Sequence, residues 1–166
     1  VHRSDDSGTT ENFTDYLSKA APSVWTEKAA QKWPSAAGGE AAKGTAGVVN
    51  AVKNGKNTIG FADESQAGEL GKVSVKVGEE FLAPTPEAAA KIVDASPKVE
   101  GRSANDLALK LDRKAAGAYP VVLVSYIIVC EAYKDANDAK LVKAFVGYVG
   151  SEAGQNALLE CKDLMQ

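Results

Sequence analysis

The sequence opens with VHRSDDSGT, residues 1–9, which combines a short strand, a turn and the start of a helix in one run. Apolar side chains recur at helical spacing directly after it, and this pattern predicts a helix over residues 11–19. Ser7, Gly8 and Thr9 therefore stand at a helix N-terminus. Unpaired backbone N–H groups and the positive end of the helix dipole favour an anion at such a position.

Arg3 and Asp5 lie just upstream in the same run. A guanidinium group presents a planar fork of donors that matches an oxyanion, and Asp5 is close enough to hold that fork in place. One interpretation is a site for phosphate or sulfate. The other is an ordinary capped helix with Ser7 or Thr9 as its N-cap, and spacing alone favours this second interpretation.

Three further segments bear on this choice, and they follow the opening run in order. They are GEAAKGTAGV at 39–48, TIGFAD at 58–63 and AYPVV at 118–122. Together with residues 1–9, they resemble the V-x-R-x-D-x-S-G-T, G-x-x-x-K-G-x-x-G-V, A-I-G-Y-V and W/Y-P-I segments of one family. That family is the phosphate-binding proteins that serve bacterial high-affinity phosphate ABC transporters.

The resemblance implies both a site and a setting. Arg3, Ser7, Gly8 and Thr9 correspond to the family's phosphate ligands, and Asp5 corresponds to the aspartate that orients the arginine. The implied function is the binding of inorganic phosphate outside the membrane for delivery to the membrane subunits of an ABC transporter. No catalysis, cofactor or metal is implied. The implied location is periplasmic or at the cell surface, with a lipid anchor on the full-length protein.

Two departures from the family pattern affect these expectations. Family members open with a lobe that begins with a T-G-A-G-A/S-T-F-P type turn, and no such segment occurs among the 166 residues. We therefore expect the chain to be the later part of a binding protein, with a first lobe of the same protein or of another chain as its partner. Asp6 also adds a negative charge beside the site. The alternative function is a non-catalytic structural or signalling module that has lost tight ligand binding.

The alternation of helical and extended patterns predicts an α/β fold. The resemblance specifies a lobe of the type II periplasmic-binding-protein kind, with a mixed sheet flanked by helices. Residues 1–125 would form most of the phosphate-gripping lobe, and residues 126–166 the end of a crossover strand and helices that return to the other lobe. Helices are expected at 11–19, 45–53, 65–70, 87–94, 105–111, 138–149 and 151–164, and strands at 58–63, 73–77 and 119–129.

Composition narrows the classes of function. A net charge of −3 argues against nucleic acid as a partner, and 45% hydrophobic residues are enough for one sizeable core. Lys43-Gly44-Thr45 reverses the Gly-Lys order that a nucleotide-binding phosphate loop requires. His2 is the only histidine and has no ligand cluster at the spacing of a zinc site. Cys130 and Cys161 fit either a disulfide or two free thiols.

Overall fold

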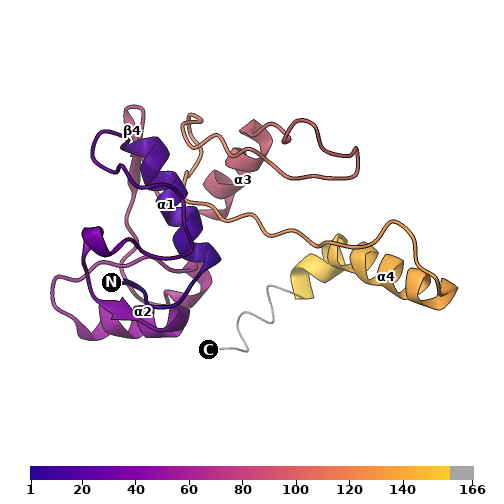
Figure 1. The fold of residues 1–166 in the computed structure, drawn as a ribbon, viewed down its shortest axis with the longest axis horizontal. Coiled ribbons are helices and arrows are strands. Elements are labelled where there is room, and N and C mark those ends of the chain that lie inside the picture. The colour runs from indigo at the N-terminus through magenta and orange to yellow at the C-terminus, as the bar shows by residue number, and fades with distance from the viewer. Residues whose placement is uncertain (158–166) are drawn as a thin grey trace. The chain divides into compact units, whose positions relative to one another are not determined.

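A computed structural model describes residues 1–157 of the 166-residue chain (Figure 1). The chain divides into two compact units, Val1–Val124 and Ser125–Gln166. The elements of the first unit are β1 (His2–Arg3), α1 (Gly8–Ala20), η1 (Ser35–Ala37), β2 (Ala41–Ala42), α2 (Gly44–Asn54), η2 (Glu64–Gln66), β3 (Val75–Val77), β4 (Glu80–Leu82) and α3 (Pro86–Ala95). The second unit contains α4 (Ala136–Val149), followed by helical residues 152–157. The fold class is α/β, as the sequence predicts.

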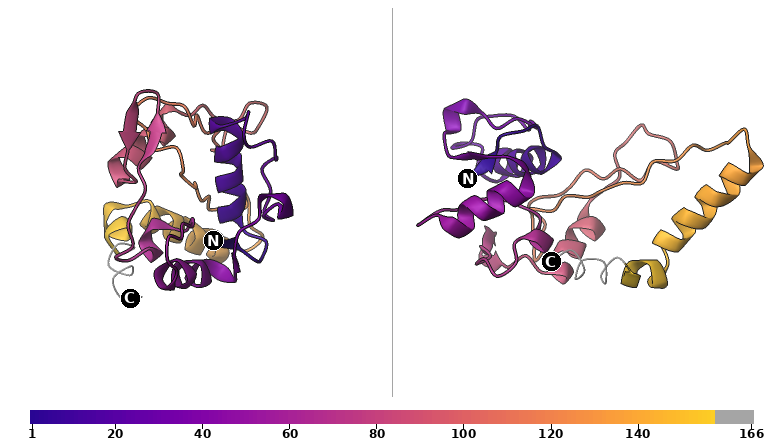
Figure 2. Two further views of the ribbon diagram at one scale, coloured as in Figure 1. Left: turned by 90° about the vertical axis from the view of Figure 1, so that its left-hand side faces the viewer. Right: turned by 90° about the horizontal axis from the view of Figure 1, so that it is seen from below.

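Two short sheets organise the first unit. Strands β1 and β2 pair in parallel, with Arg3 opposite Ala42, whereas β3 and β4 form the antiparallel hairpin seen as a pair of arrows in the left view of Figure 2. Parallel strands need a crossover connection, and α1 with the loop after it supplies this connection. The crossover places the start of α2, which follows β2 directly, beside the turn that follows β1.

Helix α1 has the sequence signals that its ends require. The Ser7 hydroxyl caps its N-terminus, Glu11 lies in its first turn and Lys19 in its last, so both charges complement the helix dipole. The expected helix at 11–19 is confirmed and begins three residues earlier, at Gly8. Its buried face is polar, because it carries Thr10 and Thr14.

The other helices begin in different ways. Lys43 precedes α2 without a side-chain cap, and Gly44 opens that helix with a positive φ of 69°. Helix α3 has Thr85 as N-cap and Pro86 at its first position, a favourable pair because proline lacks the N–H that would be unpaired there. Helix α4 is capped by Asp135. All three helices confirm the sequence prediction to within two residues at each end.

Arg113 ties α1 to the segment that leads out of the first unit. Its side chain is 3% exposed and its Nε donates to Asp15 at 2.9 Å. Its terminal nitrogens donate to the Asn12 side chain at 2.7 Å and to the Pro120 carbonyl at 2.6 Å. A longer bond of 3.3 Å reaches the Val122 carbonyl. The charge is therefore buried together with its partners, which is the condition for a buried ion to be tolerated.

The interior of the described chain is smaller than composition predicts. Its fully buried apolar side chains are Val48, Ile92, Ala118 and Pro120. Polar side chains share that interior, because two threonines of α1 and Arg113 are buried with them. Composition reports how much apolar material a chain carries, but many of these side chains remain exposed here.

Two expected strands are wrong. Residues 58–63 form no strand, and the Ile59 carbonyl instead accepts a 2.6 Å hydrogen bond from the terminal ammonium of Val1. Residues 119–129 also form no strand. Two carbonyls of that segment accept from the Arg113 side chain, and the Tyr119 N–H donates to Ala88 of α3. These three backbone groups at the start of the segment are thus satisfied by a side chain and a helix and not by a neighbouring strand.

The helix expected at 105–111 is also wrong. The Ala108 carbonyl accepts from the Val99 N–H at 2.9 Å, and the Lys110 N–H donates to Pro97 at 2.8 Å. These bonds run across to another segment and not along the chain. The helix expected at 65–70 is reduced to the single turn η2. Of the helix expected at 151–164, residues 152–157 are helical, and residues 158–164 lie outside the described residues. The strand at 73–77 is confirmed as β3.

The two buried threonines of α1 give a matched test of the interior. Thr14 donates to the Thr10 carbonyl at 2.9 Å and accepts from the Ala30 N–H at 3.1 Å, whereas the Thr10 hydroxyl has no partner among the described residues. Thr14→Val should lower the free energy of unfolding by about 0.5–1.5 kcal/mol, because it removes the acceptor of the partly buried hydrogen bond from the Ala30 N–H. Thr10→Val should leave it unchanged or raise it by about 1 kcal/mol. Urea denaturation measures both, and equal losses would contradict this assignment.

Candidate functional site

The turn before α1 carries three of the predicted site residues. The Ser7 hydroxyl accepts from the Thr9 N–H at 3.1 Å, so Ser7 is the N-cap of the helix. Its O–H is still free to donate, because a hydroxyl accepts and donates at the same time. Ser7 is 6% exposed and Gly8 is open to solvent. Within the described chain, the N–H of the exposed Gly8 has no hydrogen-bond acceptor and can serve an anion.

Arg3 and Asp5 form a two-point ion pair, as the sequence predicts. Arg3 Nε lies 2.8 Å from Asp5 Oδ1, and Nη2 lies 2.5 Å from Oδ2. The hydrogen bond to Arg3, assisted by the Gly44 N–H, holds the pKa of the Asp5 carboxyl well below its ordinary value. The same pairing raises the pKa of Arg3. Both groups therefore stay charged over the whole physiological pH range.

The Arg3 guanidinium keeps one edge available. Asp5 occupies the edge formed by Nε and Nη2, and Nη1 makes only a long 3.4 Å bond to the Thr45 hydroxyl. Within the described residues, the second N–H of each terminal nitrogen has no acceptor. These two N–H groups form a fork of the kind that binds phosphate or a carboxylate at two points. No hydrogen bond in the described chain joins Arg3 to the Ser7–Thr9 turn, which follows Asp5 after one intervening residue.

Sequence reasoning missed two residues of this arrangement. The Gly44 N–H donates to Asp5 Oδ1 at 3.0 Å, and the Thr45 hydroxyl accepts from Arg3. Both lie in the Lys43-Gly44-Thr45 run, which was noted as part of the family segment 39–48 and as a failed phosphate loop but was assigned no contact with Arg3 or Asp5. The signal was present, but its use depends on the parallel pairing of β1 with β2, which brings this run to Asp5.

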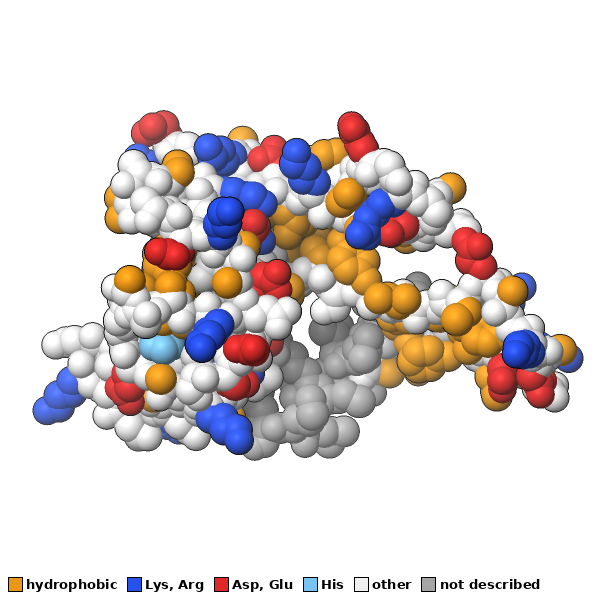
Figure 3. Space-filling model, in the orientation of Figure 1, with side chains coloured by type: hydrophobic (Ala, Val, Ile, Leu, Met, Phe, Trp, Pro, Cys, Tyr) orange, Lys and Arg blue, Asp and Glu red, His pale blue; other side chains and the backbone are white. Residues whose placement is uncertain are grey.

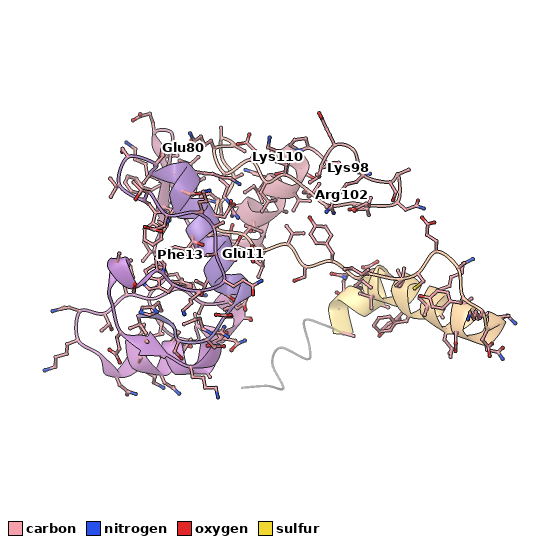
Figure 4. All side chains as sticks on the ribbon, in the orientation of Figure 1. Glu11, Phe13, Glu80, Lys98, Arg102 and Lys110 are labelled. Carbon is pink, nitrogen blue, oxygen red and sulfur yellow. The ribbon has the colours of Figure 1, made fainter. Side chains whose placement is uncertain are left out.

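An aromatic cluster supports β1 from the side. The His2 ring stacks on Trp33, with centroids 5.2 Å apart and planes 13° from parallel. Trp33 in turn contacts Phe61 at 5.6 Å and Trp25 at 5.2 Å. Phe13, which Figure 4 labels on α1 near Glu11, lies 4.5 Å from Phe61 between ring centroids. The rings fix the strand that carries Arg3, so their role is packing.

A pocket of about 550 Å³ lies at the other end of α1. Its walls come from the last turn of α1, from Pro22 and Pro97, and from residues 110–114. The predicted ligands Arg3, Ser7, Gly8 and Thr9 take no part in it.

Basic and acidic side chains are interspersed on the face of the molecule seen in Figure 3.

A known family covers most of this chain. The model of the PBP superfamily domain matches residues 1–153. This chain belongs to the PBP superfamily. The parallel pairing of β1 and β2 and the helices that follow each strand are thus the PBP form of an α/β fold.

Several proteins similar to this chain are named as phosphate-binding proteins. The chain is 32% identical over 175 residues to the phosphate-binding protein PstS3 of Mycobacterium bovis (strain BCG / Pasteur 1173P2), covering 98% of this chain and 46% of that protein. It is 33% identical over 168 residues to the phosphate-binding protein PstS 3 of Mycobacterium leprae, covering 95% and 44%. It is 36% identical over 170 residues to the phosphate-binding protein PstS of Methanocaldococcus jannaschii, covering 92% and 43%. The chain spans somewhat less than half the length of these relatives.

Two other kinds of feature, a metal site and a membrane-spanning helix, are absent from the described residues. Within residues 1–157, no three His, Cys, Asp or Glu side chains group as metal ligands. Over the same residues, no helix has the length and apolar character needed to cross a bilayer. Cys130 is exposed, and the pairing considered for it involves Cys161, which lies outside the described residues.

The lowered pKa of the Asp5 carboxyl implies a specific pH dependence of stability. A carboxyl whose pKa is lower in the folded chain stabilises the fold above its unfolded pKa of about 3.9 and loses this effect as the pH falls toward its folded value. Asp5→Asn should therefore lower the melting temperature at pH 7, and the difference from the unaltered chain should shrink steadily below about pH 4. The exposed Asp94, replaced by Asn, is the control and should change the midpoint little. A deficit that is the same at pH 7 and pH 3 would contradict the assignment.

Proposed function

We propose that the chain binds inorganic phosphate outside the cytoplasm for delivery to the membrane subunits of an ABC transporter. The ligands would be the free edge of Arg3, the Ser7 hydroxyl, the Gly8 backbone and Thr9. The observation that carries the proposal is the two-point Arg3–Asp5 pair, which holds the guanidinium by one edge and leaves N–H groups of its terminal nitrogens without an acceptor in the described residues, a few positions before the N-terminus of α1. The names of the relatives support phosphate as the anion.

The net charge of −3 is compatible with this function. Repulsion between exposed charges is screened within about 8 Å at physiological salt, whereas aligned N–H groups and a guanidinium act at contact distance. Asp6 is exposed and adds charge beside the turn, so it weakens binding only to the extent that solvent fails to screen it. Local donors therefore decide whether the anion binds.

We further propose that the site is completed by a second lobe, from the same protein or from another chain. Residues 1–125 would form most of the phosphate-gripping lobe, and residues 126–166 would return to the other lobe. Exposed apolar side chains in the second unit support this, since Ile128 is 92%, Leu141 68% and Phe145 60% exposed. Figure 3 shows hydrophobic side chains gathered along this part of the chain. The greater length of the relatives leaves room for such a lobe.

The proposed role is transport and not catalysis. It includes no metal and no cofactor, because donors from the backbone, hydroxyls and one arginine are sufficient to hold an oxyanion. It places the protein in the periplasm or at the cell surface, with a lipid anchor when full length. Nucleic acid is not among the proposed partners.

Arginine substitutions test the proposed ligand directly. Arg3→Ala should weaken phosphate binding about 10- to 100-fold, because it removes a charge-assisted contact worth about 1.5–3 kcal/mol. Arg102→Ala is the matched control, since Arg102 also pairs with an aspartate, at 2.8 Å, but on the surface. It should change the affinity less than about twofold. Calorimetry measures both, and equal losses would mean that binding is diffuse electrostatics.

The 166-residue chain should also discriminate poorly between anions. At neutral pH phosphate keeps a proton and sulfate does not, so a carboxylate that accepts this proton is needed to tell them apart. Asp5 is committed to Arg3 and to Gly44. We expect weak binding of both anions, with dissociation constants within about tenfold of each other. Tight, phosphate-selective binding in calorimetry would contradict this and would mean that Asp6 or a second copy supplies the acceptor.

A further inference from the structure

One carboxylate joins two segments that lie far apart in the sequence. Asp5 Oδ1 accepts from Arg3 Nε at 2.8 Å and from the Gly44 N–H at 3.0 Å, across 39 positions of the chain. Asp5 Oδ2 accepts from Arg3 Nη2 at 2.5 Å. The backbone of α2 therefore holds the same group that holds the arginine.

Gly44 makes this contact in a conformation that favours glycine. Its φ is +69°, in the left-handed region. A Cβ atom added to Gly44 would meet nothing within 4 Å, so the space around it would accept a side chain. The backbone angle is the constraint. A residue that prefers negative φ would rotate about N–Cα and turn the N–H away from Asp5, since α2 fixes the chain on the other side.

We propose that Gly44 is a positioning residue for the anion site: its N–H fixes the Asp5 carboxylate, and through it the vacant edge of Arg3. The inference rests on the proposed function, because it names a residue that orders a phosphate ligand without contacting phosphate. An exposed ion pair by itself is loosely held and contributes little. Asp5 is 37% exposed, so a third, backbone contact is what prevents the pair from moving as the anion arrives.

The Thr45 hydroxyl supplies a weaker second contact from the same helix. It lies 3.4 Å from Arg3 Nη1 and so approaches the guanidinium beside the edge proposed to bind phosphate. The charged groups that act on this cluster are Arg3 and Asp5 themselves and Asp63, whose charge raises the pKa of Arg3. With both oxygens of Asp5 committed, the pKa of its carboxyl reports whether Gly44 is in place.

The test uses three variants of the 166-residue chain. Gly44→Ala removes the left-handed preference, and Gly44→Asn largely keeps it, because asparagine tolerates positive φ. Gly101→Ala is the control, since Gly101 has a φ of +76° and no atom within 4 Å of an added Cβ. NMR titration of the Asp5 carboxyl without phosphate gives its pKa. Calorimetry with inorganic phosphate gives the affinity.

We expect Gly44→Ala to raise the pKa of Asp5 toward its ordinary value and to weaken phosphate binding about two- to tenfold, as for one lost hydrogen bond. Gly44→Asn should retain most of both properties although its side chain is larger, and Gly101→Ala should change neither. An unchanged Asp5 pKa or affinity in Gly44→Ala would overturn the inference, and so would a greater loss in Gly44→Asn than in Gly44→Ala. If the unaltered chain bound no phosphate, the proposed function would fail first, together with the part of the inference that concerns the ligand.

Discussion

The arrangement of the first elements of this fold depends on the contacts of the Asp5 carboxylate. It neutralises Arg3, fixes the orientation of the guanidinium and accepts an N–H from the start of α2. Strand β1 is only two residues long, so its parallel pairing with β2 cannot position a long side chain without such help. An acid in the turn after a short strand thereby contacts a second element as well as its neighbour. Arg3 keeps its charge, and one edge of its guanidinium group remains available.

The same helix, α1, is anchored at both ends by different chemistry. At its N-terminus a serine cap leaves a backbone donor open, whereas at its buried face Arg113 and Thr14 provide polar contacts. Hydrogen bonds hold this helix more than apolar burial does. Because hydrogen bonds are directional, they define the orientation of the helix more closely than an apolar face would. Such a helix keeps its N-terminus in place while staying open to solvent.

Local patterns predicted the parts of the fold that depend on neighbouring residues. The serine cap of α1, the helix α3, the strand β3 and the Arg3–Asp5 pair all follow from residues a few positions apart. The predictions that failed concern contacts between residues far apart in the sequence. Residues 119–129 read as a buried strand, but the Arg113 side chain binds two carbonyls near their start, and the part of Gly44 depends on strand pairing across 39 positions. A sequence pattern reports what a segment prefers and not which distant group will satisfy its backbone. The resemblance supplied the ligand set, which spacing alone did not.

The central claim is that Arg3 and the turn at Ser7–Thr9 form one anion site, and amide chemical-shift mapping tests it most directly. Inorganic phosphate is titrated into the ¹⁵N-labelled 166-residue chain at constant ionic strength, with chloride as the reference. We expect the largest and saturable shifts on the Gly8 and Thr9 amides and on Arg3 Nε–H. Shifts spread over the exposed lysines, or gathered around the pocket formed with residues 110–114, would contradict it.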